Sequence, residues 1–116
     1  MNSIVDLLNI TREQKLNGIW LDEDYNLYFG WDNMPDNFTG EYKNWYKNKQ
    51  LYKYCLYKNG KLEGEYKIWW DDGQLYEYCF FKNGEWDGEY KLWNYSGKLY
   101  DHSLYKNGVI IKDYLK

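Results

Sequence analysis

The sequence predicts a mainly β protein: an elongated, single-layer antiparallel β-meander of hairpin repeats with a short N-terminal capping helix. Three observations predict this fold. A unit of 24 residues recurs from Gly40, Gly64 and Gly88, each copy divides at turn signals into two extended runs, and aromatic residues make up 22% of the 116-residue chain. A fixed period of this length is typical of a repeat architecture, in which each unit packs on its neighbours.

The first two segments are interpreted as a cap and an incomplete repeat. Residues 1–16 are expected to form a helical cap, with a helix from Ser3 as N-cap to about Lys15. Because terminal repeats expose unpaired strand edges, we expect this helix to cover the first edge. Residues 17–39 are predicted to be a degenerate repeat, which keeps Trp20 of the repeated pattern but lacks its Glu-Tyr-Lys.

The three full repeats are residues 40–63, 64–87 and 88–111, and each is predicted to be one β-hairpin. In the second copy, "EYKIWW" is followed by Asp-Asp-Gly and "QLYEYCFF" by Lys-Asn-Gly. Asn-Gly and Asp-Gly between aromatic runs are strong hairpin signals, and no segment of the repeat has helical spacing. A last strand is predicted to begin near Val109, and residues 112–116 are its C-terminal end. The free edge of this strand is the expected site of self-association.

The parity of side chains along the second hairpin predicts two different faces. We expect a three-residue loop at 71–73, because a two-residue turn would place Glu77 beside Ile68. One face would then carry Tyr66, Ile68, Trp70, Tyr76, Tyr78 and Phe80. The other face would carry Glu65, Trp69, Leu75 and Cys79, with Lys67 opposite Glu77.

The aromatic face is the predicted partner-binding surface. A single-layer sheet has no second sheet to bury such a face, and contiguous exposed aromatic patches mark interaction sites. The expected contact residues are one row of Tyr42, Tyr66 and Tyr90, a second row of Tyr52, Tyr76 and Tyr100, and Trp70. The partner would be another protein or a second copy of the chain.

Charge and hydropathy argue against several classes of protein. The net charge of −3 disfavours nucleic-acid binding, which needs a basic surplus. No apolar run approaches the length of a membrane span, and the N-terminus lacks the features of a signal peptide. We therefore expect a cytoplasmic, intracellular protein.

Charge is nevertheless uneven along the chain. Residues 40–63 carry six lysines against two glutamates, whereas residues 64–87 carry two lysines against six acids. Neighbouring hairpins could neutralise each other through cross-strand pairs such as Lys53 with Glu65. Alternatively, a basic patch of Lys43, Lys47 and Lys49 would meet an acidic partner or, with less support, a membrane phospholipid.

No group of residues predicts catalysis, a metal or a cofactor. Cys55 and Cys79 occupy equivalent positions two strands apart, about 9.6 Å at the usual spacing of strands. That separation is too long for a disulfide, so both are interpreted as small packing residues. His102 stands where the other copies carry Tyr54 and Tyr78, and no nucleophile accompanies it. The sequence therefore indicates a protein that is not an enzyme.

The repeated pattern resembles that of a known family. Gly-Glu-Tyr-Lys-x-Trp, then Leu-Tyr, then Lys-Asn-Gly is similar to the variant form of the MORN repeat, found in giant viruses, bacteria and protists. The first copy departs from the pattern, with Lys49 where Gly73 and Gly97 stand. The resemblance implies a twisted antiparallel β array that serves as an interaction or scaffold module. It leaves open an antitoxin-like protein that neutralises a partner, or a peripheral phospholipid-binding module.

Overall fold

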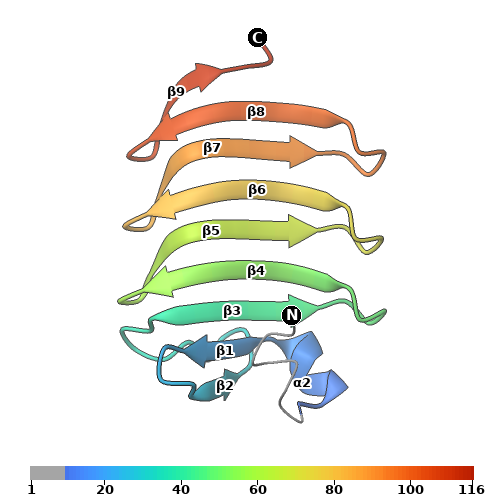
Figure 1. The fold of residues 1–116 in the computed structure, drawn as a ribbon, viewed down its shortest axis with the longest axis vertical. Coiled ribbons are helices and arrows are strands. Elements are labelled where there is room, and N and C mark those ends of the chain that lie inside the picture. Colours follow the sequence, from blue (N-terminus) through green and yellow to red (C-terminus); the bar gives the residue numbers. More distant parts are fainter. Residues whose placement is uncertain (1–9) are drawn as a thin grey trace.

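The structure, a computed structural model, describes residues 10–116. Within this part of the chain, nine strands form one antiparallel sheet of order β2-β1-β3-β4-β5-β6-β7-β8-β9 (Figure 1). The elements are α2 (Arg12–Asn17), β1 (Ile19–Asp22), β2 (Leu27–Phe29), β3 (Gly40–Trp45), β4 (Leu51–Lys58), β5 (Lys61–Trp69), β6 (Leu75–Lys82), β7 (Glu85–Trp93), β8 (Leu99–Lys106) and β9 (Val109–Asp113). The predicted fold class, an open antiparallel meander with a short N-terminal helix, is confirmed.

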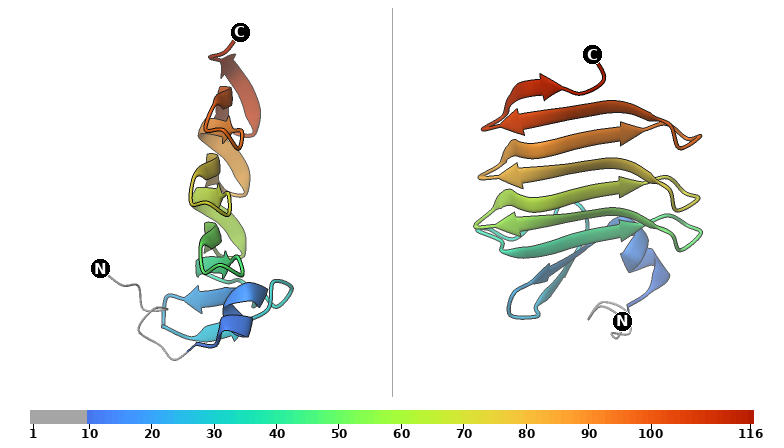
Figure 2. Two further views of the ribbon diagram at one scale, coloured as in Figure 1. Left: turned by 90° about the vertical axis from the view of Figure 1, so that its right-hand side faces the viewer. Right: turned by 45° about the horizontal axis from the view of Figure 1, so that its top comes forward.

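The molecule is elongated along the direction in which the strands stack. Its radius of gyration is 15.2 Å, whereas a compact domain of this length would have about 13 Å. The principal extents are 47 × 33 × 26 Å. Seen edge-on in Figure 2, strands β3 to β9 lie one above another in a single layer. Each repeat is therefore stabilised chiefly by the hairpins on either side of it.

One end of the hairpins is closed by two-residue turns with the expected sequence. Lys82 pairs with Glu85 across the turn, and Asn83 and Gly84 have φ values of 52° and 81°. Two successive positive φ values define a type I′ turn, whose twist matches that of the flanking strands. The turns at 59–60 and 107–108 have the same conformation.

The other end is closed by three-residue loops, as predicted. Trp70 N donates to Gln74 O at 2.8 Å, and Gly73 N donates to Trp70 O at 3.1 Å. Gly73 has φ 92°, in the left-handed region that favours glycine. A β-bulge follows at once: Trp69 pairs with Leu75 but Ile68 pairs with Glu77, so Tyr76 is an extra residue on β6.

This bulge makes the predicted division of β6 between the two faces wrong. An extra residue reverses the alternation of every side chain beyond it. Tyr66 pairs with Cys79, while Lys67 pairs with Tyr78. Tyr78 and Phe80 therefore share the face of Lys67, and Cys79 and Glu77 share the face of Tyr66. The hairpins β3–β4 and β7–β8 contain the same shift.

A second irregularity bends each repeat near its opening glycine. Between β4 and β5, Cys55 pairs with Tyr66 and Tyr57 pairs with Leu62, so β5 has two additional residues between the pairs. Gly64, within this segment, has φ 107°, a conformation that side chains with a Cβ rarely adopt. The bend turns the end of the hairpin over the face that carries Tyr66.

Within the described residues, α2 is the helical part of the N-terminal segment. Thr11 is its N-cap and forms a capping box with Gln14, so within the described residues the helix starts at Arg12. The predicted start at Ser3 lies outside the described residues. The helix packs against β3, at the N-terminal end of the sheet (Figure 1). In the described part of the chain, no helix is long and apolar enough to cross a membrane.

Candidate functional site

A row of alternating large and small side chains forms the centre of one face, which we name the tyrosine face. Successive strands place Tyr42, Cys55, Tyr66, Cys79, Tyr90 and Ser103 in direct register. Cys55, Cys79 and Ser103 have relative exposures of 0%, 1% and 2%. Small side chains between tyrosines let the rings close over them, so the small residues of this row are buried although the sheet has one layer.

The two cysteines are free and buried. Strand β5 lies between the strands that carry them, and its Tyr66 pairs with both. Burial raises the pKa of Cys55 to about 11 and that of Cys79 to about 12. Since the thiolate is the reactive form, both groups are poor nucleophiles at neutral pH. Their place in the row fits a packing role.

Aromatic side chains from the bent hairpin ends cover one side of the row. The ring of Phe81 lies 5.5 Å from that of Tyr66, and Trp86 lies 5.0 Å from Tyr90 and 4.9 Å from Tyr105. Such contacts add to the stability gained from burial of apolar area. Burial and nearby charge raise the pKa of both Tyr66 and Tyr90.

The other side of the row is formed by two sets of residues. One set is the extra residue of each β-bulge, which is Tyr52, Tyr76 or Tyr100. The other set is the residue just before each three-residue loop. The ring of Tyr46 lies 5.0 Å from that of Tyr52, and the ring of Trp70 lies 4.5 Å from that of Tyr76. In the third repeat the equivalent of Tyr46 and Trp70 is Asn94. Tyr100 consequently lacks this ring partner and is 50% exposed.

The predicted partner-binding residues thus differ in accessibility. Tyr42 is only 5% exposed, and Tyr52, Tyr66, Tyr76, Tyr90 and Trp70 are half-buried. Tyr100 alone of the seven predicted residues is exposed. Most of the aromatic face is used within the molecule, and its accessible part lies at the C-terminal end.

Exposed apolar side chains gather at that same C-terminal end. Val109, Ile110 and Ile111 of β9 are 63%, 48% and 59% exposed. Beyond them, Leu115 is 50% exposed. In the described sheet β9 pairs with β8 only, so one edge of its backbone is free. Tyr100, Ile110 and Leu115 line one shallow hollow, and we name these three side chains, with Val109 and Ile111 beside them on β9, the C-terminal patch.

The opposite face of the sheet, the lysine face, is electrostatically balanced. Its central register is Lys43, Tyr54, Lys67, Tyr78, Lys91 and His102. The lysines pair with glutamates on their own strands, as in Lys67–Glu65 at 3.2 Å and Lys91–Glu89 at 3.2 Å. The predicted pair of Lys53 with Glu65 is wrong, since Lys53 lies on the tyrosine face, 5.0 Å from the ring centroid of Tyr66.

The predicted basic patch is divided by the fold. Lys43 lies on the lysine face, 3.7 Å from Glu41, whereas Lys47 and Lys49 are exposed in the β3–β4 turn. Lys49 instead lines a pocket with Arg12 and Lys15 of α2. Sequence reasoning missed these two helix residues, although Thr11 and Gln14 carry the signal of a capping box.

His102 has the environment of a packing residue. Its ring lies 4.3 Å from that of Tyr114, and its Nε2 lies 3.8 Å from Glu89. Among residues 10–116, no group of three or more His, Cys, Asp or Glu side chains could hold a metal ion.

Tandem hairpins, regular bulges and a shared buried row define a protein of the β-hairpin repeat class. A family model described as MORN repeat variant matches residues 38–59, 62–83 and 86–107. The chain belongs to this family. No curated protein and no solved structure matches the chain. MORN repeats generally serve as interaction or membrane-binding modules, and the family is generally non-catalytic.

Proposed function

We propose that the protein is a non-catalytic interaction module that binds a second copy of itself, or another protein, through the C-terminal patch. The observation that carries this proposal is the concentration of exposed apolar side chains on a strand with a free edge. An unpaired strand edge pairs readily with a strand of another chain. Adjacent aromatic and aliphatic side chains would add the apolar burial that stabilises such a contact.

The repeat pattern supports the pairing of another strand with this edge of β9. β5 and β7 each pair with a strand on both sides, whereas β9 occupies the equivalent position with a strand on one side only. On β5 and β7 the side chains equivalent to Ile110 are Leu62 and Trp86, and both are half-buried. A partner strand beside β9 would cover Tyr100 and Ile110 in the same way.

Molar mass in solution tests this proposal. Light scattering behind a sizing column, over a wide range of concentration, should show mass rising from the monomer value of 14.3 kDa toward twice that value. Ile111→Lys should restore the monomer, because a lysine at the edge opposes strand pairing. Phe80→Lys is the matched control, since Phe80 is 41% exposed on the lysine face.

The outcomes separate the two kinds of partner. A dimer lost in Ile111→Lys but kept in Phe80→Lys supports self-association through the patch. A wild-type chain that stays monomeric throughout refutes self-association and leaves another protein as the partner. A dimer that both variants retain places the interface elsewhere and refutes the proposed surface.

A further inference from the structure

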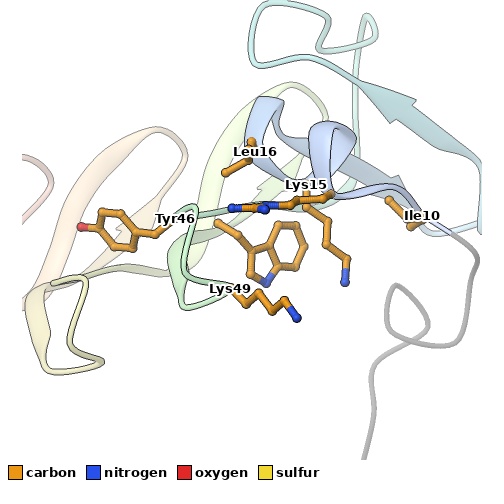
Figure 3. Close-up of a pocket in the computed structure, with 7 residues that line it drawn as sticks. Ile10, Lys15, Leu16, Tyr46 and Lys49 are labelled. Atoms are coloured by element: carbon orange, nitrogen blue, oxygen red, sulfur yellow. The ribbon is translucent and has the colours of Figure 1, made fainter.

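A pocket of about 250 Å³ lies between α2 and the β3–β4 turn, at the opposite end of the molecule from the C-terminal patch. It is lined by Ile10, Arg12, Lys15, Leu16, Trp45, Tyr46 and Lys49. Figure 3 shows Lys15 and Lys49 extending toward the same open side, with Leu16 and Ile10 on the helix side. The lining therefore combines apolar and aromatic walls with basic groups, and we name it the basic pocket.

The described lining of the basic pocket is positively charged. Of the seven lining residues within 10–116, three are cationic and none is acidic. The Arg12 guanidinium donates to Lys47 O at 2.7 Å, and Lys15 Nζ lies 5.5 Å from the centroid of the Trp45 ring. Among the described residues, no carboxylate lies within 4.0 Å of Lys15 or Lys49. A bound anion would meet two ammonium groups beside an aromatic wall.

The backbone of Lys49 provides a second, independent observation. Lys49 has φ 76°, at the position where the other repeats place Gly73 at 92° and Gly97 at 88°. For a residue with a Cβ this conformation costs about 1–2 kcal/mol. Residues held in unfavourable conformations cluster at functional sites. The first repeat thus places a lysine where a glycine is favoured, and that side chain lines the basic pocket.

The other repeats show what the framework alone would require. Trp69 and Trp93 occupy the register position of Trp45 and pair with Leu75 and Leu99. At the position of Lys49 these repeats carry Gly73 and Gly97, and α2 packs against β3 of the first repeat. The basic side chains around Trp45 come from α2 and from the departure at Lys49, so neither source is part of the repeat.

We propose that the basic pocket binds a small aromatic anion, a single ring that carries a phosphate or carboxylate group. An engineered cavity of about 150 Å³ holds a benzene molecule, so the volume of the pocket accommodates a ring and one anionic group. The ring would pack against Trp45 and Leu16. The anion would bind the ammonium groups of Lys15 and Lys49. This pocket is separate from the C-terminal patch, the proposed protein-binding surface.

Titration with phenyl phosphate, followed by the indole N–H signals in ¹H–¹⁵N spectra, tests the proposal. Trp45→Phe identifies the Trp45 signal, and the signals of Trp69 and Trp93 are internal controls. Phenyl phosphate should shift the Trp45 signal saturably. Inorganic phosphate carries only the anion and phenol carries only the ring, so each should bind at least tenfold more weakly than phenyl phosphate.

Two variants separate the pocket from general charge. Lys49→Gly restores the residue of the other repeats, so loss of binding would not reflect a damaged fold; we expect binding to weaken at least tenfold. Lys47→Gln removes the same charge from the same turn, outside the lining, and should bind within twofold of the wild type. Unchanged binding in Lys49→Gly, or equal shifts at Trp69 and Trp93, would overturn the proposal.

A further titration distinguishes two sources of the aromatic anion, a modified residue of a partner chain and a free small molecule. A blocked phosphotyrosine peptide carries the ring and anion of phenyl phosphate on a protein backbone. Tighter binding of the peptide by tenfold or more would identify a modified residue of a partner chain as the ligand. Equal or weaker binding would identify a free small molecule. Either result is consistent with an aromatic anion as the ligand. If neither phenyl phosphate nor the peptide binds, the proposal is refuted.

Discussion

Replacing Lys49 by glycine should stabilise the protein while it weakens ligand binding. Lys49 has φ 76°, and relief of that conformation gains about 1–2 kcal/mol. Glycine loses more backbone entropy on folding, which offsets about 0.5–1 kcal/mol. The net increase in the free energy of unfolding should be about 0.5–1 kcal/mol. Unfolding entropy of about 2.1 cal/mol/K per residue converts this into a rise of about 2–4 °C in Tm.

Urea unfolding followed by tryptophan fluorescence measures the change. The reciprocal variant, Gly73→Lys, is the matched test, because Gly73 has φ 92° in the same loop of the next repeat. A Cβ there would lie 3.1 Å from the amide oxygen of Gln50, the flexible end of a side chain, so backbone strain should dominate. We expect Gly73→Lys to lose about 0.5–1 kcal/mol. Destabilisation by Lys49→Gly would refute the assignment of strain to this residue.

Three further predictions follow from burial and backbone geometry. Cys55 and Cys79 should resist alkylation at pH 8 in the native protein and react at once in urea, because burial raises their pKa values to about 11 and about 12; rapid native labelling would contradict this. Burial raises the pKa of Tyr42 from 10.0 to about 12, so its contribution to stability should be complete below pH 10 and lost as pH rises through 12. Urea midpoints from pH 8 to 12, compared with those of Tyr42→Phe, should show a steeper fall for the wild type. Gly64→Ala should lower the free energy of unfolding by about 1–2 kcal/mol, because Gly64 has φ 107°; an unchanged urea midpoint would be the contrary result.

The turns could be predicted from sequence because their conformations depend on local residues. Asn83-Gly84 specifies positive φ at two positions without help from the rest of the chain. The loop at 71–73 was predictable for the same reason, through Gly73. Since these turns fix where each strand starts, the period and the order of strands followed from them.

The faces of β6 could not be predicted, because a bulge is decided by packing between strands. No local signal marks Tyr76 as the extra residue, yet it moves Tyr78 and Phe80 to the lysine face and Cys79 to the tyrosine face. One sequence feature was informative in retrospect. Cys55, Cys79 and Ser103 are all small, as expected of positions that lie between tyrosines in a buried row.

The exposed part of the candidate site depended on contacts that join neighbouring repeats. Tyr42, Tyr66 and Tyr90 look like a binding surface in sequence, but Trp20 of β1 packs on Tyr42, and rings from the bent hairpin ends partly cover Tyr66 and Tyr90. Tyr100 is left exposed because Asn94 cannot provide the ring that Trp70 provides for Tyr76. Burial of this kind is a property of the assembled array, so the sequence identified the aromatic residues and not their accessibility.

In a repeat protein, what the copies share maintains the sheet, and where one copy differs indicates function. The shared glycines, tryptophans and Asn-Gly turns recur in every unit, and each has a structural reason. Lys49 in the first repeat and Asn94 in the third are departures that the sheet does not need. The first adds a cation to the basic pocket, and the second uncovers Tyr100 in the C-terminal patch. The two departures lie in the first and third repeats, so under the two proposals made above the array would hold two binding surfaces apart, each with its own partner.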